Sequence, residues 1–296
     1  MSTIADERSA IADGQDGVVL VTGATGHVGR NVVSGLLRTG AAVRAVARRP
    51  DSARLPQGVE VVPGDLSDPK TLAGNLDGVG TVFLLWPFFT TEGAPAFLDM
   101  VGKHARRIVY LSSLAVRDDL EEQPDAVWAG VERLIGQSGL EWTFLRPSGF
   151  ATNALMWAPQ VRTGDVVRWP YGGAARPLIH ERDIADVAVQ VLTRDGHGGA
   201  RYLLTGPQVL TQVEQVRVIG EAIGRPLRYE EISPEVARRQ LLAEGWPPSF
   251  ADAALGYWAS IVAEPEPAWP AAVEEITGAP ARTFREWASE HAGDFL

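Results

Sequence analysis

The chain contains no cysteine among its 296 residues. Disulfide bonds, thiolate nucleophiles and zinc sites built on cysteine are therefore excluded, and the composition fits a reducing cytoplasm. Long apolar runs are also lacking, since no segment approaches the ~18–20 residues of a membrane-spanning helix. No group of His, Asp and Glu has metal-ligand spacing. We therefore expect a soluble, cytoplasmic protein with no metal and no membrane partner.

Positive charge is scarce, because 27 Lys and Arg face 37 Asp and Glu, a formal net charge of -10. A nucleic-acid partner needs concentrated basic residues to displace the counterions of its phosphates, so this class of partner is excluded. A small-molecule substrate is the partner that we expect. Residues 1–16 are polar and lack the apolar stretch of a signal peptide, and we expect a flexible N-terminal extension there.

Short apolar segments alternate with amphipathic segments along the first half of the chain. Strands are predicted at 18–21, 42–47, 59–62, 81–85, 108–111, 142–145 and 201–204, and helices at 26–38, 71–76, 125–137 and 183–193, the last with Asp183 as its N-cap. Continuously apolar strands with helical connections indicate an α/β fold of Rossmann type, with a doubly wound parallel sheet. We assign 17–146 plus 181–205 to a dinucleotide-binding domain, and 147–180 plus 206–296 to a small, mainly helical lid or substrate region.

A glycine-rich turn follows the first strand and opens the first helix. Its sequence, Val21-Thr22-Gly23-Ala24-Thr25-Gly26-His27-Val28-Gly29-Arg30, has the spacing Gly-x-x-Gly-x-x-Gly. The first glycine permits a sharp turn, the second lets the backbone approach a pyrophosphate, and the third lets the helix pack close to the strand. Helix N–H groups at Thr25, His27 and Val28 are then directed at the anion. The strand–turn–helix context predicts a bound dinucleotide.

The second strand ends in Ala47-Arg48-Arg49-Pro50, without the carboxylate that NAD-binding proteins usually place there. A guanidinium at Arg48 or Arg49 suits the 2′-phosphate of NADP(H), while a solvated basic turn is the alternative. Asp65 and Leu66 follow the third strand. Two roles stay open for Asp65: a hydrogen bond to the adenine amino group, or capping of a helix that begins near Asp68.

With these segments, the chain resembles the NmrA-like proteins of the atypical short-chain dehydrogenase/reductase family. The resemblance rests on the glycine turn, on Val109-Tyr110-Leu111-Ser112-Ser113, on Ser138-Gly139-Leu140-Glu141-Trp142-Thr143-Phe144-Leu145-Arg146-Pro147, on Gly149-Phe150-Ala151-Thr152-Asn153 and on Arg182-Asp183-Ile184-Ala185. It implies an NAD(P)(H)-binding Rossmann core with a small C-terminal region. It also implies that the nicotinamide is surrounded by Leu85, Trp86, Pro87, Ser112, Ser113 and the segment from Pro147 to Phe150.

The Tyr-x-x-x-Lys pair that most short-chain reductases use is absent from the chain. If Glu132 marks the register, the Lys and Tyr positions fall on Trp128 and Pro124, neither of which can donate a proton from a titratable group. The catalytic candidates are His180, which titrates near neutral pH, with Ser112 and Ser113. A capping or surface histidine, and small hydroxyls that merely end a buried strand, are the alternatives.

Aromatic residues are plentiful in the segments expected to surround the substrate. Such side chains suit flat apolar ligands, and they equally suit an ordinary lid core. Asn153 either orients a substrate or closes its loop, and Tyr171 is a second, weaker proton donor. The predicted substrate-lining residues are Trp86, Phe88, Phe150, Asn153, Trp157, Tyr171 and Trp258.

Two functions from different classes fit this sequence. The first is an NADPH-dependent oxidoreductase that transfers hydride to an apolar, aromatic or quinone-like small molecule. The second is a dinucleotide-binding redox sensor that reports to a protein partner without turnover, which the missing Tyr and Lys favour. A sugar-nucleotide epimerase ranks last, because it normally needs the absent pair.

Overall fold

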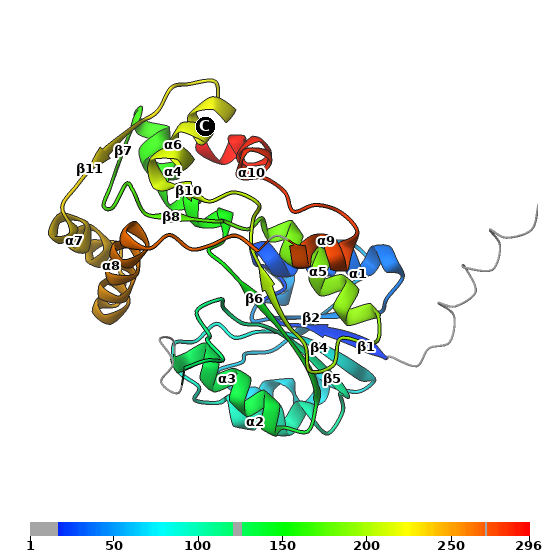
Figure 1. The fold of residues 1–296 in the computed structure, drawn as a ribbon. Coiled ribbons are helices and arrows are strands. Elements are labelled where there is room, and N and C mark those ends of the chain that lie inside the picture. The colour runs from blue at the N-terminus through cyan, green and yellow to red at the C-terminus, as the bar shows by residue number, and fades with distance from the viewer. Residues whose placement is uncertain (1–16, 121–125, 270) are drawn as a thin grey trace, which may run out of the picture. The chain divides into compact units, whose positions relative to one another are not determined.

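The computed structural model describes residues 17–120, 126–269 and 271–296 (Figure 1). The predicted extension 1–16 and Pro124 lie outside this range. The chain divides into two compact units. Unit 1 holds the described residues of Met1–Leu111, Asp125–Phe144 and Val191–Ala200, and unit 2 those of Ser112–Pro124, Leu145–Gln190 and Arg201–Leu296. The boundaries by function given above remain a prediction, and 181–190 and 201–205 group with unit 2 by contacts.

A seven-stranded sheet with the order β3-β2-β1-β4-β5-β6-β9 confirms the doubly wound fold. The pairings β1–β2, β2–β3, β1–β4 and β4–β5 are parallel, with Leu20 opposite Arg44 on one side and Val82 on the other. This order is that of dinucleotide-binding sheets. The strands are β1 (Val18–Val21), β2 (Val43–Ala47), β3 (Glu60–Pro63), β4 (Val79–Leu85), β5 (Arg107–Leu111), β6 (Glu141–Pro147) and β9 (Arg201–Leu204).

Helices cover both faces of the sheet within unit 1. Helix α1 (His27–Thr39) lies on one face, and α2 (Ala94–Val101) and α3 (Ala126–Gln137) lie on the other (Figure 1). The core on the α2 and α3 side joins Leu20, Phe97 and Ile135, each 0 % exposed. Helix α1 buries Val28, Val32, Val33 and Leu36 and ends at Gly40, whose φ of 82° allows the left-handed C-cap.

Three local predictions in this part of the chain need correction. The segment predicted as a helix at 71–76 is a 3₁₀ helix, η2 (Pro69–Asn75). Helix α2 has no counterpart among the predicted elements, because it is short and begins with Ala94 and Pro95 after a glycine, a pattern that also suits a loop. Helix α5 (Glu181–Thr193) begins two residues before Asp183, so Asp183 is not its N-cap.

Unit 2 combines helices with two small sheets. One sheet pairs β8 (Ala175–Arg176) antiparallel with β10 (Leu210–Thr211), and the other pairs β7 (Val166–Trp169) parallel with β11 (Arg228–Glu231). Its core is rich in tryptophan, including Trp157, Trp169, Trp258 and Trp287. The remaining elements are η3 (Ala151–Trp157), α4 (Ala158–Thr163), α5 up to Gln190, α6 (Gln212–Ala222), α7 (Pro234–Ala243), α8 (Pro248–Ala263), α9 (Ala271–Thr277), α10 (Phe284–Glu290) and η4 (Ala292–Phe295).

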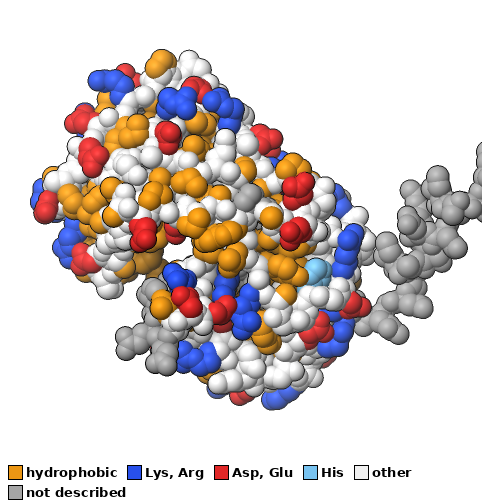
Figure 2. Space-filling model, viewed as in Figure 1, with side chains coloured by type: hydrophobic (Ala, Val, Ile, Leu, Met, Phe, Trp, Pro, Cys, Tyr) orange, Lys and Arg blue, Asp and Glu red, His pale blue; other side chains and the backbone are white. Residues whose placement is uncertain are grey.

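Helix boundaries in unit 2 follow local capping chemistry. Thr211 and Thr283 each begin a helix with a capping box, in which the hydroxyl accepts from the N–H of Glu214 or Glu286. Apolar side chains gather on the visible face of unit 2 over the region of α7 and α8, with charged side chains around them (Figure 2). Within the described ranges, no helix is long and apolar enough to cross a membrane.

Candidate cofactor and substrate residues

The glycine turn has the close approaches that its spacing predicts. Gly23 has a φ of 61°, and its carbonyl accepts a hydrogen bond of 3.0 Å from the N–H of Gly26. A Cβ atom on Gly29 would lie 2.1 Å from the carbonyl oxygen of Gly23, nearer than any real contact. Glycine is thus required at position 29 for α1 to begin directly against the turn.

The N-terminus of α1 suits an anion. Thr25, Gly26 and His27 are exposed there, and the first turn carries no acidic side chain. The N-cap, Gly26, makes no side-chain cap, so the first N–H groups of this 13-residue helix are available to a ligand. A pyrophosphate fits this arrangement, because open N–H groups and the helix dipole both favour negative charge. Val28 is buried and contributes only backbone.

Thr22 ties the turn to the end of β4. Its hydroxyl oxygen accepts from the N–H of Leu85 at 2.8 Å and lies 3.2 Å from the Leu85 carbonyl oxygen. Leu85 is half-buried and Pro87 exposed, so both stay accessible beside the turn. Trp86 is different: it is 5 % exposed, its indole N–H donates to the carbonyl of Thr90, and its ring packs edge-on to Phe88 at 4.9 Å. The indole of Trp86 is thus part of the core of unit 1.

Arg48 is exposed at the end of β2 and has no hydrogen bond or ion pair within the described ranges, nor does the side chain of its exposed neighbour Arg49. Asp65, after β3, accepts from the N–H and the hydroxyl of Ser67 at 2.9 and 2.7 Å. These bonds, followed by the charge of Arg48, lower the pKa of Asp65. Residue Asp68 is the N-cap of η2, so the capping role considered for Asp65 is wrong. Leu66 is buried.

In unit 2, the residues expected at the nicotinamide follow the ends of two strands. Ser112 is 4 % exposed, and its N–H donates to the carbonyl of Leu145 at 2.8 Å. Ser113 is half-buried, and its hydroxyl accepts from the N–H of Ala115 at 3.1 Å. Phe150 is half-buried and bridges to Ile179, while Pro147 is buried. Their place beside a nicotinamide remains a prediction.

A small pocket that is open to solvent lies in unit 2 and is called here the unit 2 pocket; its enclosed space is about 10 Å³. Three residues predicted to line the substrate, Asn153, Trp157 and Trp258, are among its walls. Tyr171 is absent from the walls and packs against the core of unit 2. The lining also includes residues that the sequence did not single out: Ala154, Met156, Ala174, Arg176, Leu178, Gln212, Gln215 and Ile261.

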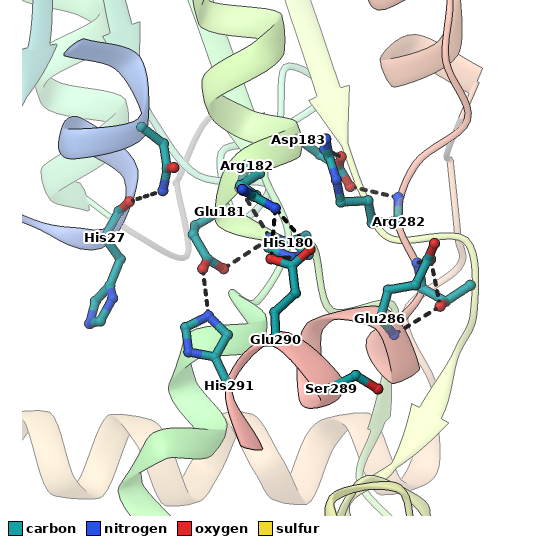
Figure 3. A network of polar contacts seen from close by, with 12 residues as sticks. His27, His180, Glu181, Arg182, Asp183, Arg282, Glu286, Ser289, Glu290 and His291 are labelled. Carbon is teal, nitrogen blue, oxygen red and sulfur yellow. Dashed lines mark hydrogen bonds and ion pairs between the residues drawn. The ribbon is translucent and has the colours of Figure 1, made fainter. Parts of the chain in front are cut away.

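His180 belongs to a buried polar network, which Figure 3 shows. Its Nδ1 lies 3.2 Å from an oxygen of Glu181 and its Nε2 lies 3.4 Å from an oxygen of Glu290. His291 bridges Glu181 at 2.8 Å and Asp294 at 2.7 Å through its two ring nitrogens. His180 is 1 % exposed and does not line the unit 2 pocket.

The network shifts the pKa values of Glu181 and His291. Burial acts to raise the pKa of Glu181, but hydrogen bonds from His180 and His291 outweigh burial and hold the pKa far below its usual range. The hydrogen bond to Glu181 raises the pKa of His291, because the imidazolium lies between two carboxylates. The part of the chain that the structure describes holds no group of three His, Asp or Glu placed for a metal ion.

Asp183 takes part in a second charged group beside this network. Its carboxylate accepts from the N–H of Arg282 at 2.8 Å and also pairs with the Arg282 guanidinium, which reaches Asp186 at 3.0 Å. Burial nonetheless leaves the pKa of Asp183 raised. Arg146 forms two hydrogen bonds of 2.9 Å to Asp118, in line with the structural ion pair expected for a strand-end arginine. These charges stabilise unit 2 and are occupied by one another.

Comparison with known proteins identifies the family. The NAD(P)H-binding family matches residues 23–195. A (4-alkanoyl-5-oxo-2,5-dihydrofuran-3-yl)methyl phosphate reductase of Streptomyces griseus is 40 % identical over 291 residues, 94 % of this chain and 99 % of the relative. The chain belongs to the NAD(P)H-binding family. An NAD(P)H azoreductase of Xenophilus azovorans is 35 % identical, over 94 % of this chain and 99 % of that one.

Several solved structures of other proteins share the fold of this chain. An NADPH-dependent quinone oxidoreductase of Escherichia coli in complex with NADPH superposes with a TM-score of 0.78 at 23 % identity, over 92 % of this chain and 99 % of the other. The triphenylmethane reductase of Citrobacter sp. with NADP(H) gives 0.75 at 21 %, over 93 % and 99 %. The resemblance to atypical short-chain dehydrogenase/reductases is confirmed, and the chain is an NAD(P)-dependent oxidoreductase.

Arg176, Gln212 and Gln215 line the unit 2 pocket but were not predicted from the sequence. Arg176 lies in a segment rich in Gly, Ala and Pro that has no periodicity, where one arginine is an ordinary surface residue. The signal that was present is the pair Gln212 and Gln215, spaced three apart on one helix face and both buried. A buried glutamine requires hydrogen-bond partners and is therefore worth marking.

Proposed function

We propose that the chain is an NADPH-dependent reductase of an electron-poor, largely apolar small molecule, such as a quinone or a carbonyl-conjugated double bond. The observation that carries the cofactor choice is Arg48. It is exposed at the end of β2, where a NAD-binding protein usually has a carboxylate, and it forms no ion pair with any residue that the structure describes. The guanidinium has the charge and the parallel N–H groups that a 2′-phosphate accepts. The residues of the turn fit the pyrophosphate of the same cofactor.

The proposed reaction does not require a strong acid from the protein. A bound nicotinamide supplies a hydride, and the acceptor takes this hydride and one proton, a two-electron reduction. For a quinone or a conjugated carbonyl, the charge left on the substrate lies on an oxygen that water or a hydroxyl can protonate. This requirement is compatible with the absence of Tyr-x-x-x-Lys. The hydroxyl of Ser113 is the protein donor in this proposal, since His180 is enclosed by carboxylates.

The relatives support an electron-poor substrate. Their names describe reduction of a dihydrofuranone, an azo compound and, at 25 % identity, a quinone. All three acceptors are conjugated systems that are polarised by electronegative atoms. The aromatic walls of the unit 2 pocket, Trp157 and Trp258, suit a flat molecule of this kind.

The test is oxidation of NADPH, followed by its absorbance, against a panel of quinones, enones, butenolides and azo compounds. We expect turnover with at least one class, and loss of turnover in Gly26→Val, which crowds the turn. A Cβ at Gly26 already approaches the carbonyl of Gly23 to 3.3 Å. Tight binding of NADPH and NADP without turnover of any acceptor would instead support a redox sensor, the second candidate, which the missing Tyr and Lys favour.

A further inference from the structure

We infer that the unit 2 pocket binds an anionic group of the substrate, a phosphate ester or a carboxylate, through the guanidinium of Arg176. The inference rests on the proposed function, because it specifies which small molecules the reductase accepts. Asn153, Trp157, Arg176 and Trp258 are among the walls of this pocket. Arg176 supplies the one formal charge of the lining, so a ligand that fills the pocket meets an uncompensated cation.

Arg176 lines the pocket without a counter-ion among the described residues, unlike several other arginines of unit 2. Arg146, Arg182 and Arg282 each pair with an aspartate or a glutamate. Arg176, in contrast, forms no ion pair with any residue that the structure describes. It is half-buried against the neutral ring of Tyr257, so the hydration it loses is not replaced by an opposite charge. An anion in the pocket would restore this interaction.

The fold fixes where the Arg176 guanidinium lies. Its backbone pairs with Leu210 across the β8–β10 sheet. A Cβ atom on Gly149 would lie 2.5 Å from Cζ and 2.6 Å from Nη1 of Arg176. The guanidinium therefore occupies the space that any other residue at position 149 would fill with its side chain. The absence of a side chain at Gly149 therefore leaves room for the Arg176 guanidinium.

Tyr257 and Glu266 leave the charge of Arg176 uncompensated. The Arg176 Cζ lies 5.6 Å from the centre of the Tyr257 ring, within cation–π distance. Burial raises the pKa of Tyr257 to about 12, so the phenol is neutral at pH 7. Its hydroxyl donates to Glu266 at 2.7 Å. Glu266 thus acts on the phenol, and it makes no ion pair with Arg176 in the described part of the chain.

The neutral walls add a donor for an anionic oxygen. Trp157 is 2 % exposed, and its indole N–H has no hydrogen-bond partner among residues 17–120, 126–269 and 271–296. Gln212 gives its amide N–H groups to the carbonyls of Pro170 and Tyr171, and Gln215 gives one to Leu210. Arg176 and the Asn153 amide are therefore side-chain donors of the lining that remain for a ligand, while the Trp157 nitrogen is itself fully buried.

Direct binding to the cofactor-free chain is the first test. Calorimetry with phenyl phosphate, benzoate and benzyl alcohol compares ligands of one ring size that differ in charge. We expect the better of the two anions to bind at least about tenfold tighter than the alcohol, and Arg176→Gln to weaken that anion by about ten- to a hundredfold. The two anions then show whether a phosphate or a carboxylate is preferred. Equal binding of anion and alcohol would overturn the inference.

Arg168→Gln is the matched control. It removes the same charge from the same unit, but Arg168 is exposed on β7 and pairs with Glu230 at 3.0 Å, away from the pocket lining. We expect anion affinity to change less than about twofold in this variant. If Arg168→Gln and Arg176→Gln weaken the anion equally, general charge and not a defined site explains the binding, and the inference is wrong.

A steric variant keeps the test decisive if Arg176→Gln folds poorly. Gly149→Ala retains the arginine but displaces its guanidinium, and we expect it to weaken the anion while leaving benzyl alcohol unchanged. Gly164→Ala is its control, because the nearest atom to a Cβ there is 4.0 Å away. Unchanged anion affinity in a folded Gly149→Ala would contradict the geometry.

Turnover separates this inference from the proposed function. Menadione and a menadione that carries a carboxylate on its second ring are compared by kcat/KM with NADPH. If the chain prefers the menadione that carries a carboxylate, and this preference is lost in Arg176→Gln, both the anion site and the reductase activity are supported. Turnover without preference, in both forms of the chain, overturns the anion site and leaves the reductase. Anion binding through Arg176 without turnover of any acceptor leaves the site and overturns the reductase.

Discussion

Charge is arranged differently in the two units. In unit 1 the glycine turn offers open backbone N–H groups, and Arg48 is exposed and forms no ion pair within the described part of the chain. In unit 2 the charges at His180, Glu181 and Asp183 are each less than 5 % exposed and contact charged partners. The turn region of unit 1 therefore keeps its charge-binding groups for a ligand, although Arg107 elsewhere in unit 1 is buried and pairs with Glu141 and Asp195. The network around His180 in unit 2 uses its charges internally, whereas Arg176 forms no ion pair with the described residues.

The difference matters because burial changes what an ion pair contributes. An exposed pair such as Arg238 with Asp252 contributes little to stability, because water screens the two charges. Removing one partner of a buried pair, such as Asp183 with Arg282, costs about 3–5 kcal/mol, since a charge is left unpaired. Charge substitutions in unit 2 are thus expected to act on stability, and those near the turn of unit 1 on cofactor affinity. Three predictions test this contrast.

The largest effect is expected for Gly29→Ala in unit 1. The added methyl group would lie 2.1 Å from the carbonyl oxygen of Gly23, so the turn and the start of α1 must separate. We expect NADPH affinity to fall at least about a hundredfold, or ~3 kcal/mol, in a binding titration. Gly136→Ala in α3, where nothing lies within 4 Å of the new Cβ, is the control and should bind normally. Normal NADPH binding by Gly29→Ala would contradict the assignment of the turn.

A smaller and more selective effect is expected for Arg48→Glu. Loss of a charge-assisted contact to the 2′-phosphate should weaken NADPH by about ten- to a hundredfold while NADH changes little. Titration of both cofactors measures the ratio, and Arg49→Glu provides the same charge reversal one residue away. An equal loss of NADPH and NADH affinity in Arg48→Glu would refute the 2′-phosphate contact.

The smallest effect concerns the pH dependence of unit 2. The pKa of His291 is raised above its unfolded value of 6.5, so its stabilisation is present below pH 6.5 and is lost as pH rises through the folded pKa. The pKa of Glu181 is lowered below 4.5, so its stabilisation is present above pH 4.5 and is lost as pH falls below it. The network thus contributes most between pH 4.5 and 6.5.

Substitution at His291 measures this contribution. We expect His291→Gln to lower the free energy of unfolding by about 1–2 kcal/mol at pH 5.5 and by less at pH 8.5, in chemical denaturation. His104→Asn removes an exposed histidine of unit 1 and should leave the pH profile unchanged. A loss in His291→Gln that is the same at both pH values would show that packing on Trp287, which stacks on His291 at 4.7 Å, outweighs charge.

Unit 1 could be predicted from the sequence because its signals are local. The strand ends and the glycine spacing lie within a few residues of the groups they position, and the sheet order follows from repeated β-α-β units. The burial of Trp86 was not predicted, since it depends on Phe97 of α2, a helix that the sequence analysis did not predict. A segment following a strand does not show which of its aromatic rings turns inward.

The side-chain contacts of unit 2 could not be predicted from the sequence, because they join segments that are far apart in the chain. Glu181 meets His291 across 110 positions and Asp183 meets Arg282 across 99. Asp183 lies inside the first turn of α5 and is not its N-cap, although its position at the start of an amphipathic segment suggested a cap. No sequence pattern marked Arg176 as a binding residue. Its role depends on two features of the fold: no carboxylate of the described residues pairs with it, and Gly149 has no side chain to fill the space of its guanidinium.

The way the two units interleave along the chain restricts how members of this family can be recombined. Unit 2 is assembled from Ser112–Pro124, Leu145–Gln190 and Arg201–Leu296. A chimaera joined at one point near residue 200 would take Trp157 and Arg176 from one parent and Trp258 from the other, so the two sides of one pocket would come from different proteins. Exchange of substrate preference between relatives therefore requires all three segments to be moved together. The glycine turn, in contrast, lies on one short segment and can be exchanged alone.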